Sequence, residues 1–273
     1  MKMKIKRKGR KEVVIFLIMT LFAVVMLYPF YFMINTAFKS NDQFLGAGGH
    51  SFLSWHKLFQ ALPVGRQLWN STIVCLASIT LILIVSTMAG YSLAKLRSKL
   101  SWLFFLGIVG AMLIPLQSII IPAYINASHL NLLSGYWGAI FIYSALGTPF
   151  ATFLMTSYFR GLPDDLVEAA ICDGLSYRRV FTKIALPLAV PAVVTIIVLQ
   201  FIQIWDDLLV GLLFIQDPNY RTITVGLGAL SAGRTTDIPV LMAGSLISAI
   251  PAVAVYLIFQ RQLVNGLTAG IGK

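Results

Sequence analysis

The sequence predicts an all-α membrane protein with six transmembrane helices. Of its 273 residues, 58% are hydrophobic and 11% are charged, whereas about a quarter of the residues in soluble domains are charged. Six apolar segments are each long enough to cross a bilayer, which takes about 20 residues. Lysine and arginine are concentrated in alternate connecting segments. Because the apolar segments take up most of the chain, we expect no separate soluble enzyme domain.

The six predicted spans alternate with polar or turn-rich segments. The first has 20 residues, more than the roughly 7–15 of a signal-peptide core, so we expect it to be retained as a helix. Acidic or basic residues occur only in the fifth span, which contains Asp206 and Asp207. The predicted spans are Val13–Phe32, Ile73–Ala94, Trp102–Ala123, Tyr136–Tyr158, Leu188–Leu213 and Ile238–Phe259.

The basic residues predict the orientation of the chain in the membrane. Seven of the 21 lysines and arginines lie in the first 11 residues, and placing the N-terminus inside puts 16 of the 21 on the inner side. Cytoplasmic loops are enriched in these residues. We therefore expect cytoplasmic N- and C-termini and a cytoplasmic loop at residues 160–187. A basic block directly before an apolar span is typical of such an anchor, so we expect no nucleic-acid partner.

Two long segments fall on the predicted outer side of the membrane. The first covers residues 36–69 and the second runs from about residue 216 to 237. Four apolar residues at helical spacing predict a short amphipathic helix at the interface within the first segment. These residues are Phe52, Trp55, Leu58 and Phe59. Both segments are interpreted either as ordinary loops or as docking surfaces for a protein outside the membrane.

The longest polar stretch after the first third of the chain is Leu162–Pro191. Within it, Pro163–Cys172 predicts a short helix, because proline suits a first helical turn. Asp164 and Asp165 follow where negative charge favours the helix N-terminus. Gly174 is the expected stop, since glycine adopts the left-handed conformation at little cost.

A second short helix is expected to begin at Ser176, a residue type that caps helix N-termini well. The two helices would form an elbow projecting from the membrane. Small residues on one face of the first helix would permit close approach to a neighbouring protein. That face comprises Leu166, Ala169, Ala170 and Asp173. The alternative interpretation is that the elbow only covers the end of the helix bundle.

This segment resembles the EAA signature of ABC importer permeases, E-A-A-x3-G-x9-I-x-L-P. Glu168–Gly174 reads E-A-A-I-C-D-G, nine residues follow, and Ile184–Pro187 reads I-A-L-P, so every fixed position matches. Flanking pieces are similar to the sugar-importer branch, of the maltose-permease second-subunit kind. They are N-S-T-I-V at Asn70, R-T-I-T-V-G-L at Arg221–Leu227 and G-L-T-A-G at Gly266–Gly270.

The resemblance implies a type I importer permease fold with a coupling helix that contacts an ATP-hydrolysing subunit. It also implies a bacterial inner-membrane location and several partners: a second permease chain, most simply a different one, two ATP-binding subunits and an extracellular or periplasmic solute-binding protein. The substrate implied is a sugar or oligosaccharide. The residues expected to couple to the ATPase are Glu168, Ala169, Ala170, Asp173, Gly174, Leu175, Ser176 and Arg178.

The chain itself is expected to carry no ATPase site. The phosphate-binding pattern G-x-x-x-x-G-K-[ST] does not occur in the sequence, so ATP and Mg²⁺ would be bound by the partner subunits. Cys75, Cys172 and the three histidines lack metal-ligand spacing, and no cofactor or metal is expected in this chain.

Polar residues late in the fifth span are candidates for the substrate path. A charged side chain at the centre of a lipid-facing helix costs about 2.5–3.5 kcal/mol, so the two aspartates are expected at the outer interface, in a wet cavity or at a subunit contact. They are interpreted as a gate or sugar contact, or as a structural polar pair. Adjacent carboxylates on a helix would not flank one glycosidic bond. The candidates are Gln200, Gln203, Trp205, Asp206 and Asp207.

Three other function classes remain open from the sequence. An ion-coupled secondary carrier would use the two aspartates, a membrane-embedded enzyme would need a catalytic constellation that the sequence lacks, and a related permease would carry a non-sugar solute.

The predicted organisation is a basic tail at 1–12, a first helix at 13–35, an outer loop at 36–69, a five-helix core at 70–261 and a C-terminal tail at 262–273.

Overall fold

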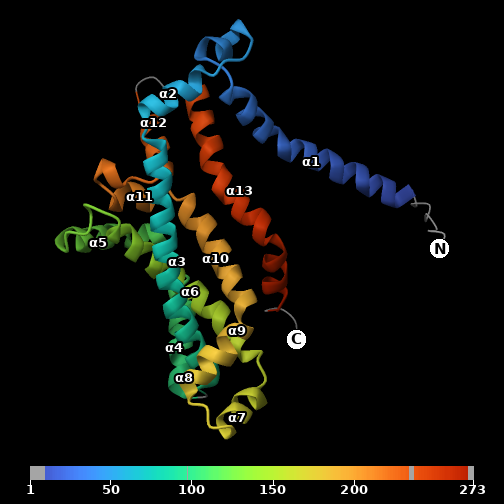
Figure 1. Cartoon of the computed structure of the whole chain (residues 1–273), viewed down its shortest axis with the longest axis vertical. Coiled ribbons are helices and arrows are strands. Elements are labelled where there is room, and N and C mark those ends of the chain that lie inside the picture. Colours follow the sequence, from blue (N-terminus) through green and yellow to red (C-terminus); the bar gives the residue numbers. More distant parts are fainter. Residues whose placement is uncertain (1–9, 97, 234–236, 270–273) are drawn as a thin grey trace. The chain divides into compact units, whose positions relative to one another are not determined.

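Every described element of this chain is helical. The computed structural model describes residues 10–96, 98–233 and 237–269 (Figure 1), and among these residues there is no strand. The predicted all-α class is therefore confirmed. The described residues leave out the basic positions before Arg10 and also Arg97, Arg234, Gly270 and Lys273.

The chain divides into two compact units. Unit 1 comprises Met1–Leu62 and Leu230–Ile247, and unit 2 comprises Pro63–Ala229 and Ser248–Lys273. The last long helix, α13 (Ile238–Ala269), contributes to both.

Unit 1 contains α1 (Arg10–Ala37) and α2 (Leu53–Ala61). The side chains of α1 are exposed from Glu12 to Phe32 although nearly all are apolar, which is typical of a helix that faces lipid or another chain. The short amphipathic helix predicted in the first outer segment is α2. Its Leu58 is fully buried, whereas Phe59 is 59% exposed.

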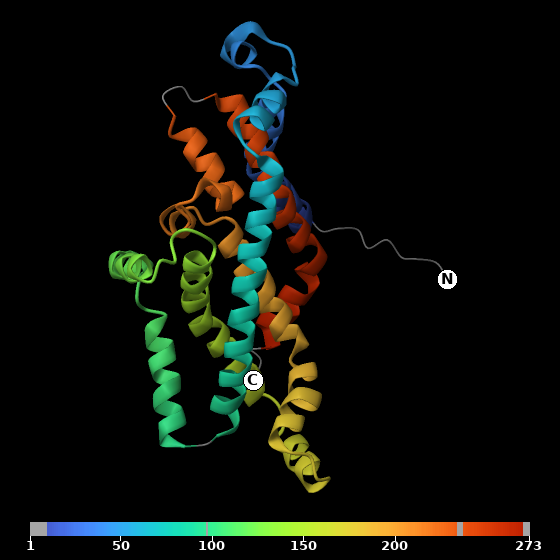
Figure 2. The same cartoon turned by 60° about the vertical axis from the view of Figure 1, so that its left-hand side comes forward.

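Unit 2 is built around α3 (Val64–Lys95), which packs along α6 (Trp137–Arg160) and α10 (Val190–Trp205) (Figures 1 and 2). Helix α3 begins nine residues before the predicted span, at Val64 rather than Ile73. The seam between α3 and α6 is close because Gly90 of α3 lies against Met155 of α6. Buried apolar residues such as Val74 and Ile82 fill the rest of the seam.

The predicted third span is wrong as one continuous helix. It is broken into α4 (Lys99–Ala111) and α5 (Leu116–His129), which meet at an angle of 97° (Figure 2). Pro115 stands at the break with ψ of 140°. A proline has no N–H to donate and disfavours the helical conformation of the residue before it, here Ile114, so the helix ends and restarts in a new direction.

The predicted fifth span is also wrong as one continuous helix, because α10 stops at Trp205 and a separate helix, α11, covers Leu209–Phe214. The segment before α10 consists of α8 (Tyr177–Val180), a π-helical turn (Phe181–Ala185) and α9 (Leu186–Leu188). This segment meets α10 at 69° at the start of the predicted span, where Pro191 cannot donate the hydrogen bond that would continue the helix.

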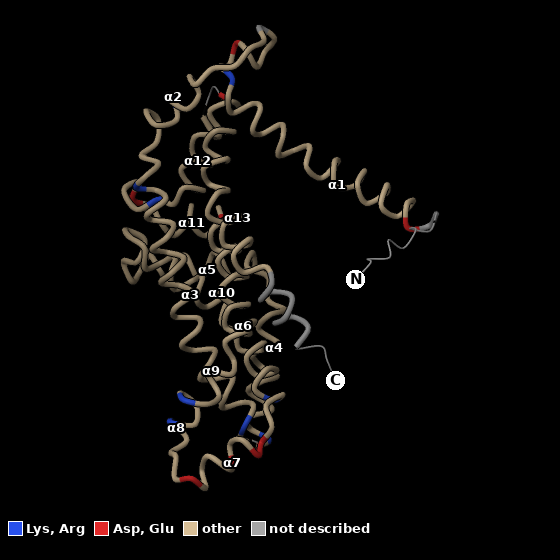
Figure 3. The backbone as a smooth tube through the Cα atoms, turned by 45° about the vertical axis from the view of Figure 1, so that its right-hand side comes forward, with Lys and Arg blue, Asp and Glu red and all other residues tan. Residues whose placement is uncertain are grey.

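Within the described residues, four helices are long and apolar enough to cross a membrane, and six spans result if each bent pair is counted as one. These spans correspond to the six predicted ones. The remaining described elements are a π-helical turn (Gln43–Ala47), α7 (Asp164–Cys172), a 3₁₀ turn (Pro218–Tyr220) and α12 (Ile223–Ser231). In unit 2 the charged residues gather near its ends, with one group around α7 and α8 (Figure 3).

We predict that Gly90→Ala destabilises the protein. A Cβ at position 90 would lie 2.6 Å from Met155 Cβ and 3.0 Å from the backbone nitrogen of Thr156, and overpacking of this kind costs about 1–3 kcal/mol. Gly65→Ala in the same helix is the matched control, because nothing lies within 4 Å of its added Cβ. Thermal unfolding of the purified protein in detergent should show a lower midpoint for Gly90→Ala alone. An unchanged or higher midpoint would contradict the close seam.

Candidate functional site

The candidate coupling segment lies between α6 and α10 and is formed by α7 and α8. Helix α6 ends at Arg160 and α7 begins at Asp164. The predicted helix start was one residue early: Pro163 occupies the N-cap position of α7 rather than its first turn. Asp164 and Asp165 are in the first turn, as predicted, where their charge complements the helix dipole.

Gly174 ends α7 as predicted, with a φ of +81°. Its N–H donates to Ile171 O at 2.9 Å, and the N–H of Leu175 donates to Ala170 O at 3.0 Å. This pair of bonds is the Schellman motif, which satisfies carbonyl groups that the helix end leaves unpaired. The direction in which the chain leaves α7 is therefore set by backbone hydrogen bonds that require a left-handed residue.

Most of the predicted coupling residues lie on the free surface of this elbow. Ala170 is the exception, at 6% exposure, and Leu175 is half-buried. Of the predicted small-residue face, only Ala170 turns toward the chain itself, while Leu166, Ala169 and Asp173 are exposed. The exposed coupling candidates are Glu168, Ala169, Asp173, Gly174, Ser176 and Arg178.

Ser176 occupies the N-cap position of α8, as predicted, with an extended backbone conformation. Its side chain makes no capping hydrogen bond. Ser176 therefore stands at the expected capping position, but its side chain does not satisfy an N–H group of α8. The residue itself is exposed.

Lys95, which sequence reasoning treated only as one of the basic inner residues, bonds to this segment. Its Nζ lies 2.9 Å from Asp164 Oδ1 and 2.9 Å from Leu162 O. Both partners are more than 60 residues away along the chain. The only signal in the sequence is a basic residue in the last turn of one helix and an acidic residue in the first turn of another.

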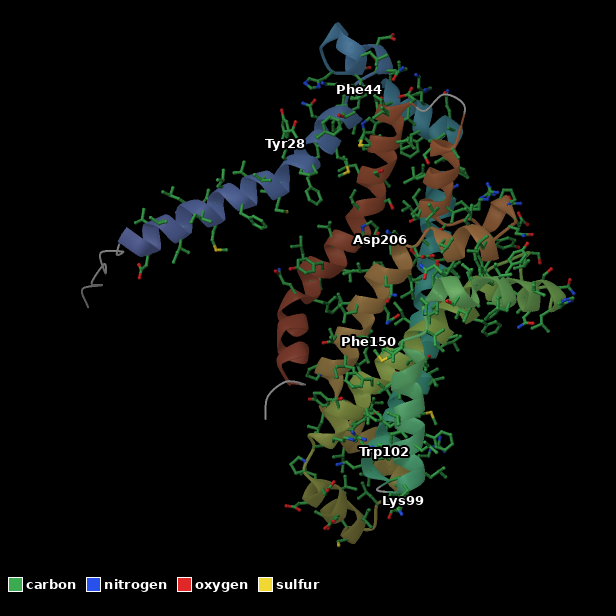
Figure 4. The ribbon with its side chains drawn as sticks, turned by 180° about the vertical axis from the view of Figure 1, so that it is seen from behind. Tyr28, Phe44, Lys99, Trp102, Phe150 and Asp206 are labelled. Carbon is green, nitrogen blue, oxygen red and sulfur yellow. The ribbon has the colours of Figure 1, made fainter. Side chains whose placement is uncertain are left out.

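The predicted substrate-path residues do not share one environment. Gln200 and Trp205 are each 3% exposed. The amide of Gln200 lies beside Gly147 of α6, and Trp205 Nε1 donates to Ser248 O at 2.9 Å. Gln203 and Asp206 are exposed, and Figure 4 shows Asp206 at the end of α10.

Asp207 stabilises the break between α10 and α11. Its Oδ1 accepts a hydrogen bond from Tyr143 Oη at 2.8 Å and another from Val210 N at 2.8 Å. A carboxylate in this position satisfies an N–H of the first turn of α11, as a capping residue does. This geometry supports the structural interpretation of Asp207. A role of these five residues in the substrate path stays a prediction.

A second polar cluster joins the start of α3 to the segment before α12. Asn70 Nδ2 donates to Asn219 O and to Arg221 O, both at 2.9 Å, and Ile223 N donates to Ser71 Oγ at 3.0 Å. The N-S-T-I-V and R-T-I-T-V-G-L pieces of the sequence are therefore in direct contact. Sequence reasoning quoted both pieces without placing them together.

Among the described residues, no group of three or more His, Cys, Asp or Glu side chains is placed to hold a metal ion. Cys75 is buried and Cys172, in the last turn of α7, is exposed.

Comparison with known families decides the class. The family described as binding-protein-dependent transport system inner membrane component matches residues 83–268, which include the whole coupling segment. The chain belongs to this family. It is an integral membrane component of a transport system, and the predicted importer-permease family is confirmed.

Individual relatives agree over nearly the whole chain. The probable ABC transporter permease protein YurM of Bacillus subtilis is 32% identical over 269 residues, covering 97% of this chain and 89% of the relative. The trehalose/maltose transport system permease protein MalG of Thermococcus litoralis is 32% identical over 271 residues, covering 96% and 97%. A solved bacterial ABC transporter involved in alginate import has a chain with the same fold, at a TM-score of 0.80 and 22% identity, covering 94% and 99%.

We predict that Asp207→Ala destabilises the protein more than Tyr143→Phe. The alanine variant loses both hydrogen bonds and leaves two donors unpaired, which costs about 1–3 kcal/mol for each buried group, while the phenylalanine variant removes one bond. Asp206→Ala, one residue away at an exposed position, is the control and should unfold like the unmodified protein. Thermal unfolding in detergent gives the order, and equal effects of Asp206→Ala and Asp207→Ala would argue against the capping role.

Proposed function

We propose that this chain is a membrane-spanning permease subunit of an ATP-driven importer and forms half of the translocation pathway for a sugar or oligosaccharide. The observation that carries the proposal is the elbow of α7 and α8, which in a member of this family presents three of the four fixed E-A-A-x3-G positions, Glu168, Ala169 and Gly174, on an exposed surface. The substrates named for two similar proteins, trehalose and maltose for one and alginate for the other, support a saccharide.

The exposed side of α7 is the contact for the ATP-binding subunits. Ala169 and Gly174 allow close backbone approach, and Glu168 and Asp173 offer carboxylates to polar groups of the partner. Two such subunits bind ATP and Mg²⁺, and this chain carries no ATPase site of its own. The loop at residues 160–187 and both termini are then cytoplasmic, which agrees with the distribution of basic residues.

Transport proceeds by alternating access. ATP binding closes the ATP-binding subunits, and the coupling helices move with them, so that the permease pair opens to the outside, where a solute-binding protein delivers the sugar. The nucleotide can shift this equilibrium only through its different affinity for the two states. The elbow must therefore be stiff, and the Schellman cap at Gly174 supplies part of that stiffness.

A second permease chain completes the pathway, most simply a different one. The exposed apolar surface of α1 supports this, because most side chains of α1 are not buried against the rest of unit 1 and can contact another chain. An ion-coupled carrier is less well supported, since Asp207 is already bonded to Tyr143 and Val210. ATP-independent uptake by this chain alone in liposomes would favour that alternative.

We predict that Gly174→Pro and Glu168→Lys each uncouple ATP hydrolysis from uptake. Proline fixes φ near −65° and cannot adopt the +81° of position 174, while lysine reverses a charge on the contact surface. Sugar uptake and ATP hydrolysis are measured together in proteoliposomes that contain the permease pair, the ATP-binding subunits and the binding protein. Uptake per ATP should fall by about fivefold or more, the lower end of typical coupling between sites.

Thr182→Ala is the control on the same segment, because Thr182 is exposed and its hydroxyl bonds only within its own helical turn, to Arg178 O and Arg179 O. It should transport like the unmodified protein. Normal uptake per ATP in both Gly174→Pro and Glu168→Lys would contradict the proposed contact.

A further inference from the structure

Lys95 links the end of α3 to the turn after α6 and to the first turn of α7 through one ammonium group. It is the last residue of α3, and its two acceptors are the carbonyl of Leu162, in the turn after α6, and the carboxylate of Asp164, in the first turn of α7. The lysine side chain is only 13% exposed, and that of Asp164 is 41% exposed. Partial shielding from water makes this ion pair less screened than a pair of freely exposed side chains.

Apolar packing holds α7 only weakly against the rest of unit 2. Ala170 is the one buried residue among its nine. A groove of about 500 Å³ lies between α7 and the end of α3, lined by Tyr91 and Leu96 on one side and by Val167 and Ile171 on the other. Side chains do not fill this space. The hydrogen bond and ion pair of Lys95 therefore connect the end of α3 directly to the start of α7.

We propose that Lys95 is a positioning residue for energy coupling, which fixes the first turn of α7 to the end of α3. This inference rests on the proposed function. When the ATP-binding subunits displace α7, the link moves α3, and α3 runs through the helix seam to Asn70 and Ser71 at its other end. Without the link, α7 shifts into the adjacent groove and the displacement is lost locally.

Five variants in the reconstituted complex test this inference. Lys95→Met removes the charge at similar length, Lys95→Arg keeps the charge, and Asp164→Ala removes the partner. A double variant combines Lys95→Met with Asp164→Ala. Lys99→Met is the matched control, an exposed lysine four residues away at the start of α4 (Figure 4). The quantities measured are sugar imported, ATP hydrolysed and the amount of assembled complex.

We expect Lys95→Met and Asp164→Ala each to lower uptake per ATP by about fivefold or more, as for a lost coupling free energy of typical size. The double variant should be no worse than either single one, because the two residues act as a pair. Lys95→Arg should recover most of the coupling, and Lys99→Met should keep the normal ratio.

An unchanged ratio of uptake to ATP hydrolysis in Lys95→Met overturns the inference. Equal losses of uptake and hydrolysis also overturn it, because they indicate only a role in stability. If Lys95→Met fails to assemble, the ratio in Asp164→Ala decides by the same criterion. Failure of the unmodified complex to import a sugar with ATP would instead contradict the proposed function, so the two failures are distinguishable.

Discussion

The close packing of α3 against α6 is the constraint on which the rest of unit 2 depends. Helix α3 has 32 residues and is therefore about 48 Å long at 1.5 Å per residue. Gly90 brings it against Met155 of α6, and its two ends bond to different polar segments. Asn70 holds the segment before α12, and Lys95 holds the start of α7. A single packed helix thus connects the two polar regions, which are otherwise separated by apolar structure.

The elbow at α7 combines exposure with a defined direction. A helix of nine residues gains little from its own backbone bonds, and this one buries only Ala170. Its direction is set by the bonds at its two ends, with Lys95 at the first turn and the Schellman motif at Gly174. Such a helix can offer nearly its whole surface to another protein and still pass a displacement to the helices behind it.

Local chemistry made much of this predictable from the sequence. Composition and segment length predicted six spans, and the first-turn aspartates and Gly174 predicted α7 almost to the residue. The breaks were not predictable in the same way, because prolines occur inside α6 at Pro149 and inside α13 at Pro251 without ending either helix. Whether a proline breaks a helix depends on neighbouring helices. The partners of Asp164 and Asp207 lie 69 and 64 residues away, and no local pattern specifies such pairs.

The most direct test of the central claim uses the exposed Cys172 in the last turn of α7, since Cys75 is buried. The rate at which a membrane-impermeant maleimide labels Cys172 is compared in inside-out and right-side-out vesicles, with the ATP-binding subunits present or removed, and Cys172→Ser identifies the labelled site. The account predicts labelling from the cytoplasmic side only, slowed when those subunits are bound. Labelling from the outside would contradict the account, and so would a labelling rate that is the same with and without the ATP-binding subunits.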